Sequence, residues 1–467
     1  MAFRLLGRRG RPWHNWSRNL SAFPERVFFP ETVEDVIAII ATARAQKKKI
    51  RVTGTSHSWA PLVPTDDFLI FTAKLKGITV DLSDRKKPLV TVSAGTTIAE
   101  FNEACRKNGL VLPTNVVPED FMIAAVATAG CHGTGLRQGI VSDHVERVEL
   151  IDADGRFRCV NGSCGADVLS AVQLSLGLLG FIWQMTFRVE PAFAVHQVDD
   201  AKVDMESAID TFEERVLAHD YTQFEWWPFN RYMWIKHYDR TGGEPDTRFC
   251  RRCWTQLVQR LKLYAGLGTY TLMMLCPRLT PPLMRIMYPV ANATDDLIVP
   301  AEWAIHYQAG LRIIRATNME VAFPAGEHFE NVKRAWRVVV RKTRDYQARG
   351  SYPFNQAMIA RFVDGSRVPL SPAYGHGVMC FIEIVTYADT PEWVEFSTEV
   401  MSEWLRIPHA RPHWAKESRQ FPPAAIRAAY GDDLKEFIRV RDRLGADNHN
   451  LFVNDHLESV FLPGDAS

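Results

Sequence analysis

The stretch Ile50-Arg51-Val52-Thr53-Gly54-Thr55-Ser56-His57-Ser58 gives the first indication of the fold. Its first four residues form a short predicted strand, which runs directly into a loop of small residues around His57. A loop of this kind exposes backbone N–H groups, which form a concave site for an anion such as a pyrophosphate. A surface turn with glycine at positive φ explains the same residues, so this loop alone leaves both interpretations open.

A second loop of small residues favours a cofactor site. It reads Ala127-Thr128-Ala129-Gly130-Cys131-His132-Gly133-Thr134-Gly135, and a third loop, Gly177-Leu178-Leu179-Gly180, leads into a predicted strand. Neither the G-x-G-x-x-G fingerprint nor a P-loop is present, which disfavours a nicotinamide-linked Rossmann enzyme and a nucleotide hydrolase. His57 and His132 lie inside the first two loops, where an imidazole could act as a nucleophile toward a cofactor.

Short helices and strands surround these loops. Thr32 and Thr97 are the expected N-caps of two helices, although Asp35 makes the first capping box only approximate. Asp154-Gly155 predicts a hairpin turn. The predicted strands cover residues 68–71, 78–82, 89–92, 145–152 and 181–189. Because they do not alternate regularly with helices, the pattern indicates an α+β domain.

After Pro191 the pattern changes, and residues 192 to about 430 indicate a second domain. It holds most of the tryptophans, with helices expected at 207–218 and 331–349 and strands at 319–325 and 378–386. Arg411-Pro412-His413-Trp414-Ala415-Lys416 gathers three potential cations around an aromatic residue. With Arg361 and Glu383, these groups could position a substrate hydroxyl and balance negative charge on a reduced cofactor, although a solvated charged loop is the simpler explanation.

Composition and targeting signals exclude several classes of protein. The 467 residues carry 55 basic and 54 acidic side chains, so a net charge of +1 gives no reason to expect nucleic-acid binding. The N-terminus has no apolar segment typical of a secretory signal, and charges and prolines interrupt the apolar stretch 261–293. We therefore expect a cytoplasmic protein without a transmembrane helix, in which 261–293 forms a loop or short helices. Peripheral membrane association is kept as an alternative.

The eight cysteines are too sparse for a disulfide framework. Cys250 and Cys253 form a CxxC pair, but no second pair completes a zinc site. The arginines between them could lower a thiol pKa, so the role of this pair stays open. We expect no metal.

Together these motifs resemble the vanillyl-alcohol-oxidase-type FAD enzymes, and among them the aldonolactone and alditol oxidases. Trp13-His14-Asn15-Trp16, Pro30 through Val36, Leu370 through Gly375 and Phe452-Val453-Asn454 extend the match along nearly the whole chain. The resemblance implies an FAD-binding domain at 1–191, with its core at about 24–191, and an α+β substrate or cap domain at 192–435. The C-terminal segment 436–467 is expected to pack back near the FAD.

The resemblance also implies the site residues. The first-loop histidine of this family is often linked to the flavin 8α-methyl carbon, so His57 is expected to hold FAD covalently. Arg361, His413 and Lys416 match polar active-site positions of the cap. The expected reaction oxidises a carbinol group of a sugar-derived lactone or polyol, with hydride passing to flavin N5 and electrons then to O2 or another acceptor. The other expected FAD contacts are Gly54, Thr55, Ser56, Ser58, Val116, Thr128, Gly130, His132, Gly133, Thr134, Gly135, Gly180, Ile182 and Asn454.

Two departures from the family pattern keep alternatives open. Ile359 stands where the family usually has a glutamate, two residues before Arg361, which also allows a larger hydrophobic alcohol such as a sterol or a lipid-linked sugar. Val116 stands where oxidases commonly have glycine, which favours a dehydrogenase that passes electrons to a quinone or cytochrome. A flavin-fold protein that binds without redox turnover is the third alternative.

Overall fold

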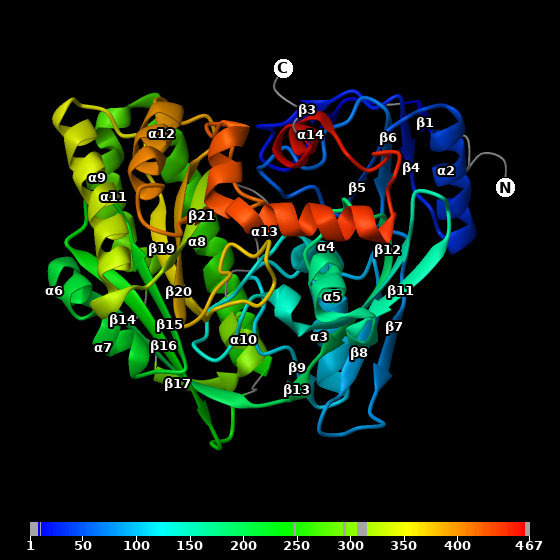
Figure 1. The fold of residues 1–467 in the computed structure, drawn as a ribbon. Coiled ribbons are helices and arrows are strands. Elements are labelled where there is room, and N and C mark those ends of the chain that lie inside the picture. Colours follow the sequence, from blue (N-terminus) through cyan, green and yellow to red (C-terminus); the bar gives the residue numbers. More distant parts are fainter. Residues whose placement is uncertain (1–7, 10, 247–248, 293–295, 306–314, 463–467) are drawn as a thin grey trace.

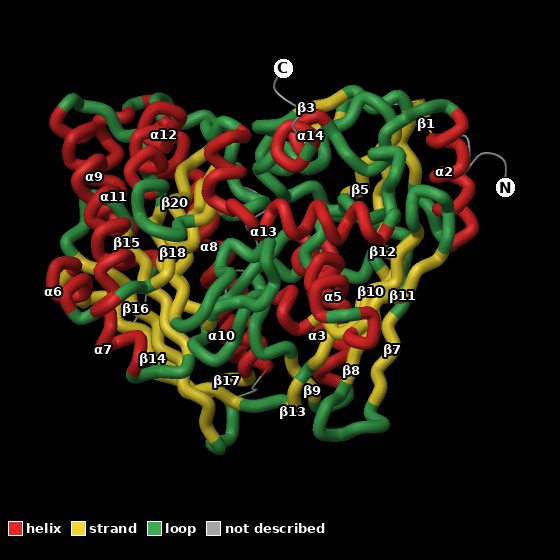
Figure 2. The backbone as a smooth tube through the Cα atoms, viewed as in Figure 1, coloured by secondary structure: helices red, strands yellow, loops and turns green. Residues whose placement is uncertain are grey.

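The chain folds into two lobes that lie side by side (Figure 1). The structure, a computed structural model, describes residues 8–9, 11–246, 249–292, 296–305 and 315–462. Strands gather in two groups, one in each lobe (Figure 2). The first lobe holds the residues up to about 191, and the second is built on one large sheet.

Two sheets form the first lobe. A four-stranded sheet has the order β1-β4-β6-β5, in which β4, β6 and β5 run parallel. Its strands are β1 (Arg8–Arg9), β4 (Arg26–Phe28), β5 (Ile50–Thr53) and β6 (Phe68–Phe71). A five-stranded antiparallel sheet has the order β11-β10-β12-β8-β7. Its strands are β7 (Ile78–Asp81), β8 (Leu89–Ser93), β10 (Val145–Ile151), β11 (Phe157–Asn161) and β12 (Phe181–Arg188).

Helices and short strand pairs complete this lobe. The helices are α2 (Val33–Ala45), α3 (Ile98–Lys107), α4 (Ile123–Thr128), α5 (Ala166–Gln173), η1 (Val141–His144) and η2 (Gly162–Cys164). The short strands are β2 (Trp13–His14), which pairs with β3 (Ser21–Ala22), and β9 (Leu110–Val111), which pairs with β13 (Glu190–Pro191).

The two predicted helix N-caps are confirmed, and the start of the second small-residue loop differs from its prediction. Thr97 caps α3 as predicted. Thr32 caps α2, and its capping box is complete, because the shorter side chain of Asp35 also reaches the backbone N–H of Thr32. The second small-residue loop is shorter than predicted. Its first two residues, 127 and 128, end helix α4, and the loop begins at Ala129.

An eight-stranded antiparallel sheet forms the second lobe, in the order β17-β14-β16-β15-β19-β20-β18-β21. Its strands are β14 (Ala194–Asp204), β15 (Tyr221–Trp226), β16 (Tyr232–Thr241), β17 (Asp296–Pro300), β18 (Ala316–Pro324), β19 (Ala357–Asp364), β20 (Val378–Tyr387) and β21 (Arg411–Pro412). The sequence predicted only β18 and β20. Strands such as β15 are buried on both faces, so their polar positions do not mark a solvent side.

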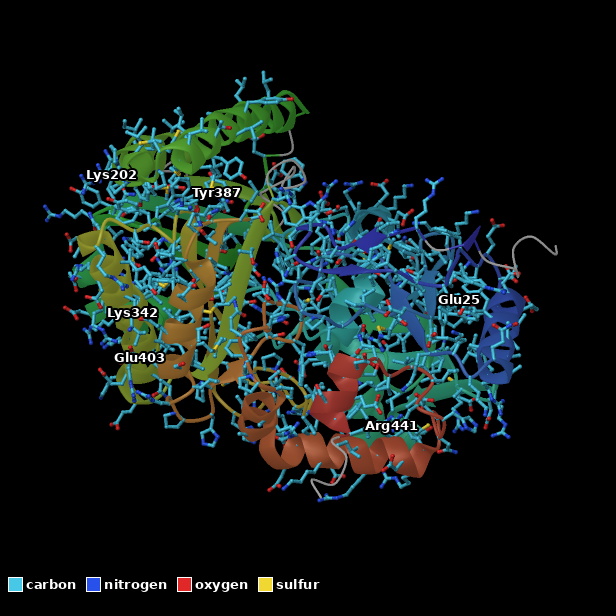
Figure 3. All side chains as sticks on the ribbon, turned by 90° about the horizontal axis from the view of Figure 1, so that it is seen from above. Glu25, Lys202, Lys342, Tyr387, Glu403 and Arg441 are labelled. Carbon is cyan, nitrogen blue, oxygen red and sulfur yellow. The ribbon has the colours of Figure 1, made fainter. Side chains whose placement is uncertain are left out.

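Helices cover the outer face of this sheet (Figure 1). They are α6 (Met205–Asp210), α7 (Phe212–Leu217), α11 (Glu330–Ala348) and α12 (Trp393–Trp404), with η4 (Glu327–Phe329) before α11. The single helix expected at 207–218 is two helices, because the chain leaves the helical conformation at Thr211. Lys342 of α11 bonds Glu399 of α12 at 2.6 Å and lies 3.7 Å from Glu403, on the outside of the lobe (Figure 3).

The expectation of a loop or short helices at 261–293 is wrong for its first half. Helix α8 (Phe249–Leu275) is 27 residues long, because the first proline after it is Pro277. Next come η3 (Pro277–Leu279), α9 (Thr280–Ala291) and α10 (Ala301–Ile305). Leu261 and Leu275 are exposed on α8. Among the described residues, none of the helices has the length and apolar character that crossing a bilayer requires. The side chains of Cys250 and Cys253 lie outside the described part of the chain.

The end of the chain crosses back from the second lobe to the first (Figures 1 and 3). Its helices are α13 (Pro423–Leu444) and α14 (Asp455–Phe461). Arg441 of α13 donates to the backbone carbonyl of Leu178 in the first lobe. The backbone N–H of Ile50 on β5 donates to the carbonyl of Leu451 at 2.7 Å. One continuous hydrophobic core contains side chains of both lobes, including Phe101 and Phe381.

Candidate active site

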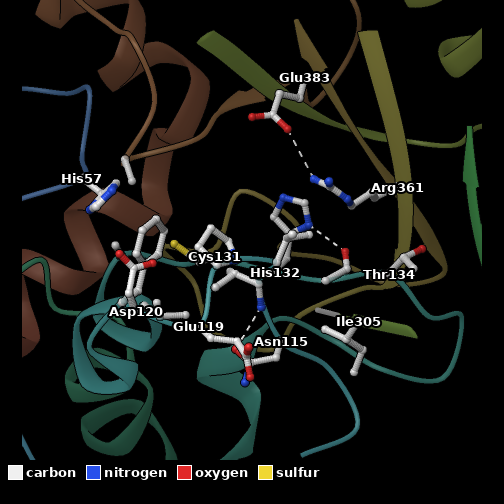
Figure 4. Close-up of a pocket in the computed structure, with 18 of the residues that line it drawn as sticks. His57, Asn115, Glu119, Asp120, Cys131, His132, Thr134, Ile305, Arg361 and Glu383 are labelled. Atoms are coloured by element: carbon white, nitrogen blue, oxygen red, sulfur yellow. Dashed lines mark hydrogen bonds and ion pairs between the residues drawn. The ribbon is translucent and has the colours of Figure 1, made fainter. Parts of the chain in front are cut away.

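A cavity of about 1440 Å³ lies between the lobes. Sites for one small molecule usually measure about 300–1,000 Å³. This cavity can therefore hold a larger ligand together with a small substrate. One wall consists of the first-lobe loops, and the other is the inner face of the eight-stranded sheet. Figure 4 shows His57 on one side, Arg361 and Glu383 on the other, and His132 between them.

The loop after β5 holds His57 in the cavity wall. Ser56 has a φ of 58°, the left-handed region that residues other than glycine seldom adopt. The backbone N–H of Trp16 donates to the Ser56 carbonyl at 2.8 Å, and the Trp13 indole N–H donates to its hydroxyl at 3.2 Å. The His57 ring stacks on Trp16 with centroids 5.2 Å apart and lies 4.4 Å from Phe121. This strained turn is therefore fixed by its neighbours, a feature common at functional sites.

His132 connects the second loop to the second lobe. Its ring stacks on Phe381 of β20, with centroids 3.5 Å apart. Nε2 lies 3.1 Å from Oε1 of Glu320, and Nδ1 lies 2.9 Å from the carbonyl oxygen of Gly133. Both ring nitrogens therefore face acceptor oxygens of the protein, one from Glu320 and one from Gly133. The imidazole is therefore held within the protein rather than pointed toward a ligand phosphate.

Four charged side chains from three strands and the loop after β21 form a buried network. Arg361 Nη1 donates to Glu383 Oε2 at 3.3 Å, and Arg361 Nε donates to Gln223 Oε1 at 3.2 Å. Lys416 Nζ donates to Glu383 Oε1 at 2.5 Å and lies 3.5 Å from Glu320 Oε2. The network places two cations and two carboxylates in the cavity wall.

The network favours the charged forms of Glu320 and Lys416. Burial alone would raise the pKa of Glu320, but Lys416 and His132 outweigh it and hold the pKa well below its usual range. Burial alone would lower the pKa of Lys416, yet Glu320 and Glu383 raise it above its ordinary value. Glu320 is therefore ionised and Lys416 is protonated near neutral pH.

His413 lies beside this network as a neutral imidazole. Burial lowers the pKa of His413 to about 3. Its Nδ1 accepts a hydrogen bond from the backbone N–H of Ala415 at 3.0 Å, which leaves the proton on Nε2. His132, Glu320 and His413 each offer one ligand atom, all within 4.8 Å of one another, as a metal site would. Because Lys416 already supplies a cation to Glu320, we interpret the cluster as an ion-paired network.

One transverse row of the sheet carries three carboxylates into the cavity. Glu225 pairs with Ile359, and Ile359 pairs with Glu383. Glu383 in turn pairs with Glu320. All four side chains line the cavity. Ile359, which stands where the resemblance implies a glutamate, is therefore flanked by a glutamate on each neighbouring strand.

Most of the predicted site residues line this cavity, and three do not. Asn454 caps α14, and its amide donates to the carbonyls of Pro61 and Pro64. Gly130 and Gly135 adopt positive φ in the loop, away from the cavity lining. The lining residues among those predicted are Gly54, Thr55, Ser56, His57, Ser58, Val116, Thr128, His132, Gly133, Thr134, Gly180, Ile182, Arg361, His413 and Lys416.

The sequence interpretation missed several polar residues of the cavity wall. Gln223 and Glu225 alternate with Phe224 and Trp226 on β15, and this alternation was the available signal. Glu320 lies on β18, which the sequence predicted, and Lys236 lies on β16, which it did not. Both side chains are buried and line the cavity. Only the pairing of distant strands brings these side chains together.

Two protein families match the chain. Residues 24–160 match the family described as FAD binding domain. Residues 185–460, more than half of the chain, match the family described as D-arabinono-1,4-lactone oxidase. The chain is 25% identical to L-gulonolactone oxidase of Mus musculus, over 97% of this chain and 99% of that protein. It is 28% identical to L-gulono-1,4-lactone dehydrogenase of Mycobacterium tuberculosis, over 97% of this chain and 99% of that protein.

The fold has a close counterpart among solved structures. Cholesterol oxidase from Brevibacterium sterolicum superposes with a TM-score of 0.82 at 17% sequence identity, over 97% of both chains. This likeness confirms the mixed α and β fold predicted from the sequence motifs. The chain belongs to the D-arabinono-1,4-lactone oxidase family, a group of FAD-dependent enzymes that oxidise CH–OH groups.

Proposed function

We propose that the protein oxidises a carbinol group of a sugar-derived lactone, with FAD bound in the cavity between the lobes. The observation that carries this proposal is the buried network of Arg361, Glu383 and Lys416 in the cavity wall. It faces the small-residue loops of the FAD-binding domain across the same cavity (Figure 4).

The residues of the first lobe suit FAD. The loop at 54–58 and the loop at 129–134, apart from Gly130, line the cavity with mostly small side chains and backbone, which fits a pyrophosphate. Gly54 and Gly133 are required by the loop packing, since a Cβ would lie 2.6 Å from Met122 Cγ and 2.7 Å from the Asn115 carbonyl oxygen. When bound, FAD supplies the acceptor for the two electrons of the alcohol.

We further propose that His57 binds FAD covalently. Its ring is in the cavity wall, and the rings of Trp16 and Phe121 restrict its orientation. A ring held in one direction loses little conformational freedom when a bond forms at one of its nitrogens.

We propose separate roles in substrate binding and charge stabilisation for three polar side chains of the second lobe. The ammonium of Lys416 stays protonated and stabilises negative charge that develops nearby. The guanidinium of Arg361 is oriented by Gln223 and Glu383 and can bind a lactone oxygen. His413 presents an Nε2–H, so it donates to a substrate oxygen rather than accepting its proton. The hydroxyl proton then leaves to water or to another basic group.

The cavity wall favours a hydroxylated substrate over a sterol. Glu225, Glu383 and Glu320 line it, and all three are buried. A large apolar alcohol would exclude water from the Oε2 atom of Glu225 and offer no hydrogen bond in its place, at a cost of about 1–3 kcal/mol. A sugar lactone offers hydroxyls at several carbons and avoids this cost.

The electron acceptor is either O2 or a quinone or cytochrome. Val116 lines the cavity, and its backbone N–H donates to Asn115 Oδ1 at 2.9 Å. A side chain larger than glycine at this position restricts the approach of O2, so we favour a dehydrogenase. Peripheral membrane association stays a prediction, supported by the exposed apolar side chains of α8, and co-sedimentation with vesicles would test it.

An anaerobic bleaching screen tests the proposed function. The holoenzyme is mixed with L-gulono-1,4-lactone, D-arabinono-1,4-lactone, an alditol and a sterol, and flavin absorbance is followed. We expect bleaching by at least one lactone and none by the sterol. Bleaching by the sterol alone would contradict the proposed substrate class. Re-oxidation with air and with a quinone then identifies the acceptor.

A further inference from the structure

A second polar group lies in the cavity, beyond the network around Arg361. Glu225 of β15 and Trp234 of β16 pair directly across the sheet, and both side chains line the cavity. They are 3% and 8% exposed, respectively. Asn292, which follows α9, is also buried and lines the same cavity.

The polar atoms of this group are not satisfied by the described part of the protein. Glu225 Oε1 accepts from the indole N–H of Trp227 at 2.7 Å, while its Oε2 is buried and accepts no hydrogen bond. Trp234 Nε1 is buried without an acceptor, and neither amide atom of Asn292 has a partner. Buried polar groups of native proteins nearly always have partners, so several together in one cavity wall indicate a ligand.

The mixture of atoms identifies the kind of ligand. Glu225 Oε2 can only accept while ionised, and Trp234 Nε1 can only donate. A hydroxyl group both donates and accepts, so adjacent hydroxyls can satisfy both side chains. The Trp234 ring is itself held in place, since the ammonium of Lys236 lies 3.7 Å from its centroid.

The spacing matches a sugar-sized molecule. Glu225 and Glu383 are separated by the single strand β19, which carries Ile359 between them. Two inter-strand steps measure about 10 Å. A lactone whose reacting end lies at Glu383 therefore extends its tail over Ile359 toward Glu225.

We propose that Glu225, Trp234 and Asn292 form a distal subsite that binds the tail hydroxyls of a polyhydroxylated substrate. This proposal rests on the proposed function, because the reacting carbinol is assigned to the Arg361 end of the cavity. Ile359 then packs against the carbon skeleton between the two polar ends.

Three lactones of different tail length test the subsite. L-gulono-1,4-lactone has two tail hydroxyls, D-arabinono-1,4-lactone has one, and 2-hydroxy-γ-butyrolactone has none. Dissociation constants are measured by calorimetry on the anaerobically pre-reduced holoenzyme, which cannot turn over, and KM and kcat on the oxidised enzyme. The variants are Glu225→Gln and Trp234→Phe, with Glu214→Gln on the exposed surface of α7 as the matched control.

We expect each subsite variant to weaken L-gulono-1,4-lactone binding about tenfold or more. Binding of 2-hydroxy-γ-butyrolactone should not change, and kcat should stay within about twofold. Equal losses for all three lactones, or no loss for any, would overturn the subsite. Unchanged thermal midpoints confirm that the variants are folded. If the native enzyme oxidises none of the lactones, the proposed function fails, while the dissociation constants still decide the subsite.

Discussion

Ile359 on β19 and Glu383 on β20 are direct neighbours across the large sheet. The family resemblance implies a carboxylate at the position of Ile359, two residues before Arg361. Here the adjacent strand supplies one, and Glu383 Oε2 lies 3.3 Å from Arg361 Nη1. The arginine therefore keeps a buried acidic partner, although the sequence pattern around it lacks one.

Restoring the family residue should destabilise this protein. Ile359→Glu would place a carboxylate between Glu225 and Glu383, and like charges directly opposite each other in a sheet repel. We expect the free energy of unfolding to fall by about 1–3 kcal/mol in urea denaturation. Ile359→Leu keeps the volume and is the control. A glutamate variant as stable as the leucine variant would contradict the proposed charge arrangement.

Removing the Lys416 ammonium should slow the chemistry. Lys416→Met leaves Glu320 and Glu383 without their shared cation and removes a positive charge from the cavity wall. We expect the anaerobic rate of flavin reduction by lactone to fall about 100- to 1,000-fold in stopped-flow measurements. Lys435→Met on the exposed side of α13 is the matched control. Similar rates in both variants would remove Lys416 from the catalytic residues.

His57→Ala should separate the flavin from the chain. The native protein is expected to stay yellow after acid precipitation, because the proposed bond would attach FAD to His57. The variant should bind FAD only non-covalently, release it into the acid supernatant and turn over more slowly. His14→Ala, which removes an exposed histidine of β2, serves as control. Flavin that remains attached in the His57 variant would show that another residue forms the bond.

Val116→Gly should make the reduced enzyme react faster with air. The substitution removes an isopropyl group from the cavity wall without touching the network around Lys416. Flavin reduction by lactone should therefore keep its rate. Both half-reactions can be followed by flavin absorbance after anaerobic reduction. Unchanged re-oxidation would mean that another feature controls access of O2.

The buried histidines should make stability depend on pH. Burial lowers the pKa of His413 to about 3 and that of His144 to about 4, against about 6.5 in the unfolded chain. Below pH 6.5 the unfolded state binds protons that the native state does not, so stability falls as the pH falls. Between pH 7.5 and 5 we expect a loss of about 1–2 kcal/mol per histidine.

Urea denaturation at several pH values measures this loss. The variant His144→Gln should lose about 1–2 kcal/mol less stability between pH 7.5 and 5 than the native protein, because one of the buried histidines is gone. The lowered pKa of Glu320 acts in the same direction, but only below about pH 4.5, where the unfolded carboxyl takes up its proton. A native protein equally stable at pH 7.5 and 5 would contradict the assignment of neutral buried histidines.

Local signals made much of the first lobe predictable. Thr97 and the Asp154-Gly155 turn act through neighbouring residues, and the structure has a capped helix and a hairpin there. The small-residue loops also line the cavity. Their small side chains leave room for a ligand, and this property can be read from the sequence. Asn454 is different, because it was predicted as an FAD contact from its place in a family motif. Its side-chain oxygen instead caps α14, and its side-chain NH2 donates to the carbonyls of Pro61 and Pro64.

The second half of the site depends on strand pairing, which a single sequence does not contain. Glu225, Glu320 and Glu383 are up to 158 positions apart in number and meet only because β15, β19, β20 and β18 are adjacent in register. Their polarity looked like that of a solvent-facing strand side. The cavity makes that side internal, so the alternation on β15 marked a polar face without showing that this face lines a site.

The contact between the two ends of the chain sets an order of events during synthesis. Arg51, buried beside the His57 loop, donates to the carbonyl oxygens of Leu62, Leu176 and Phe452. Until residues 451 and 452 have been synthesised, this guanidinium lacks one of its acceptors, and the backbone N–H of Ile50 on β5 lacks the carbonyl of Leu451 as its acceptor. The first lobe, although made first, therefore completes these two hydrogen bonds only after the C-terminal segment around residues 451–452 has been made.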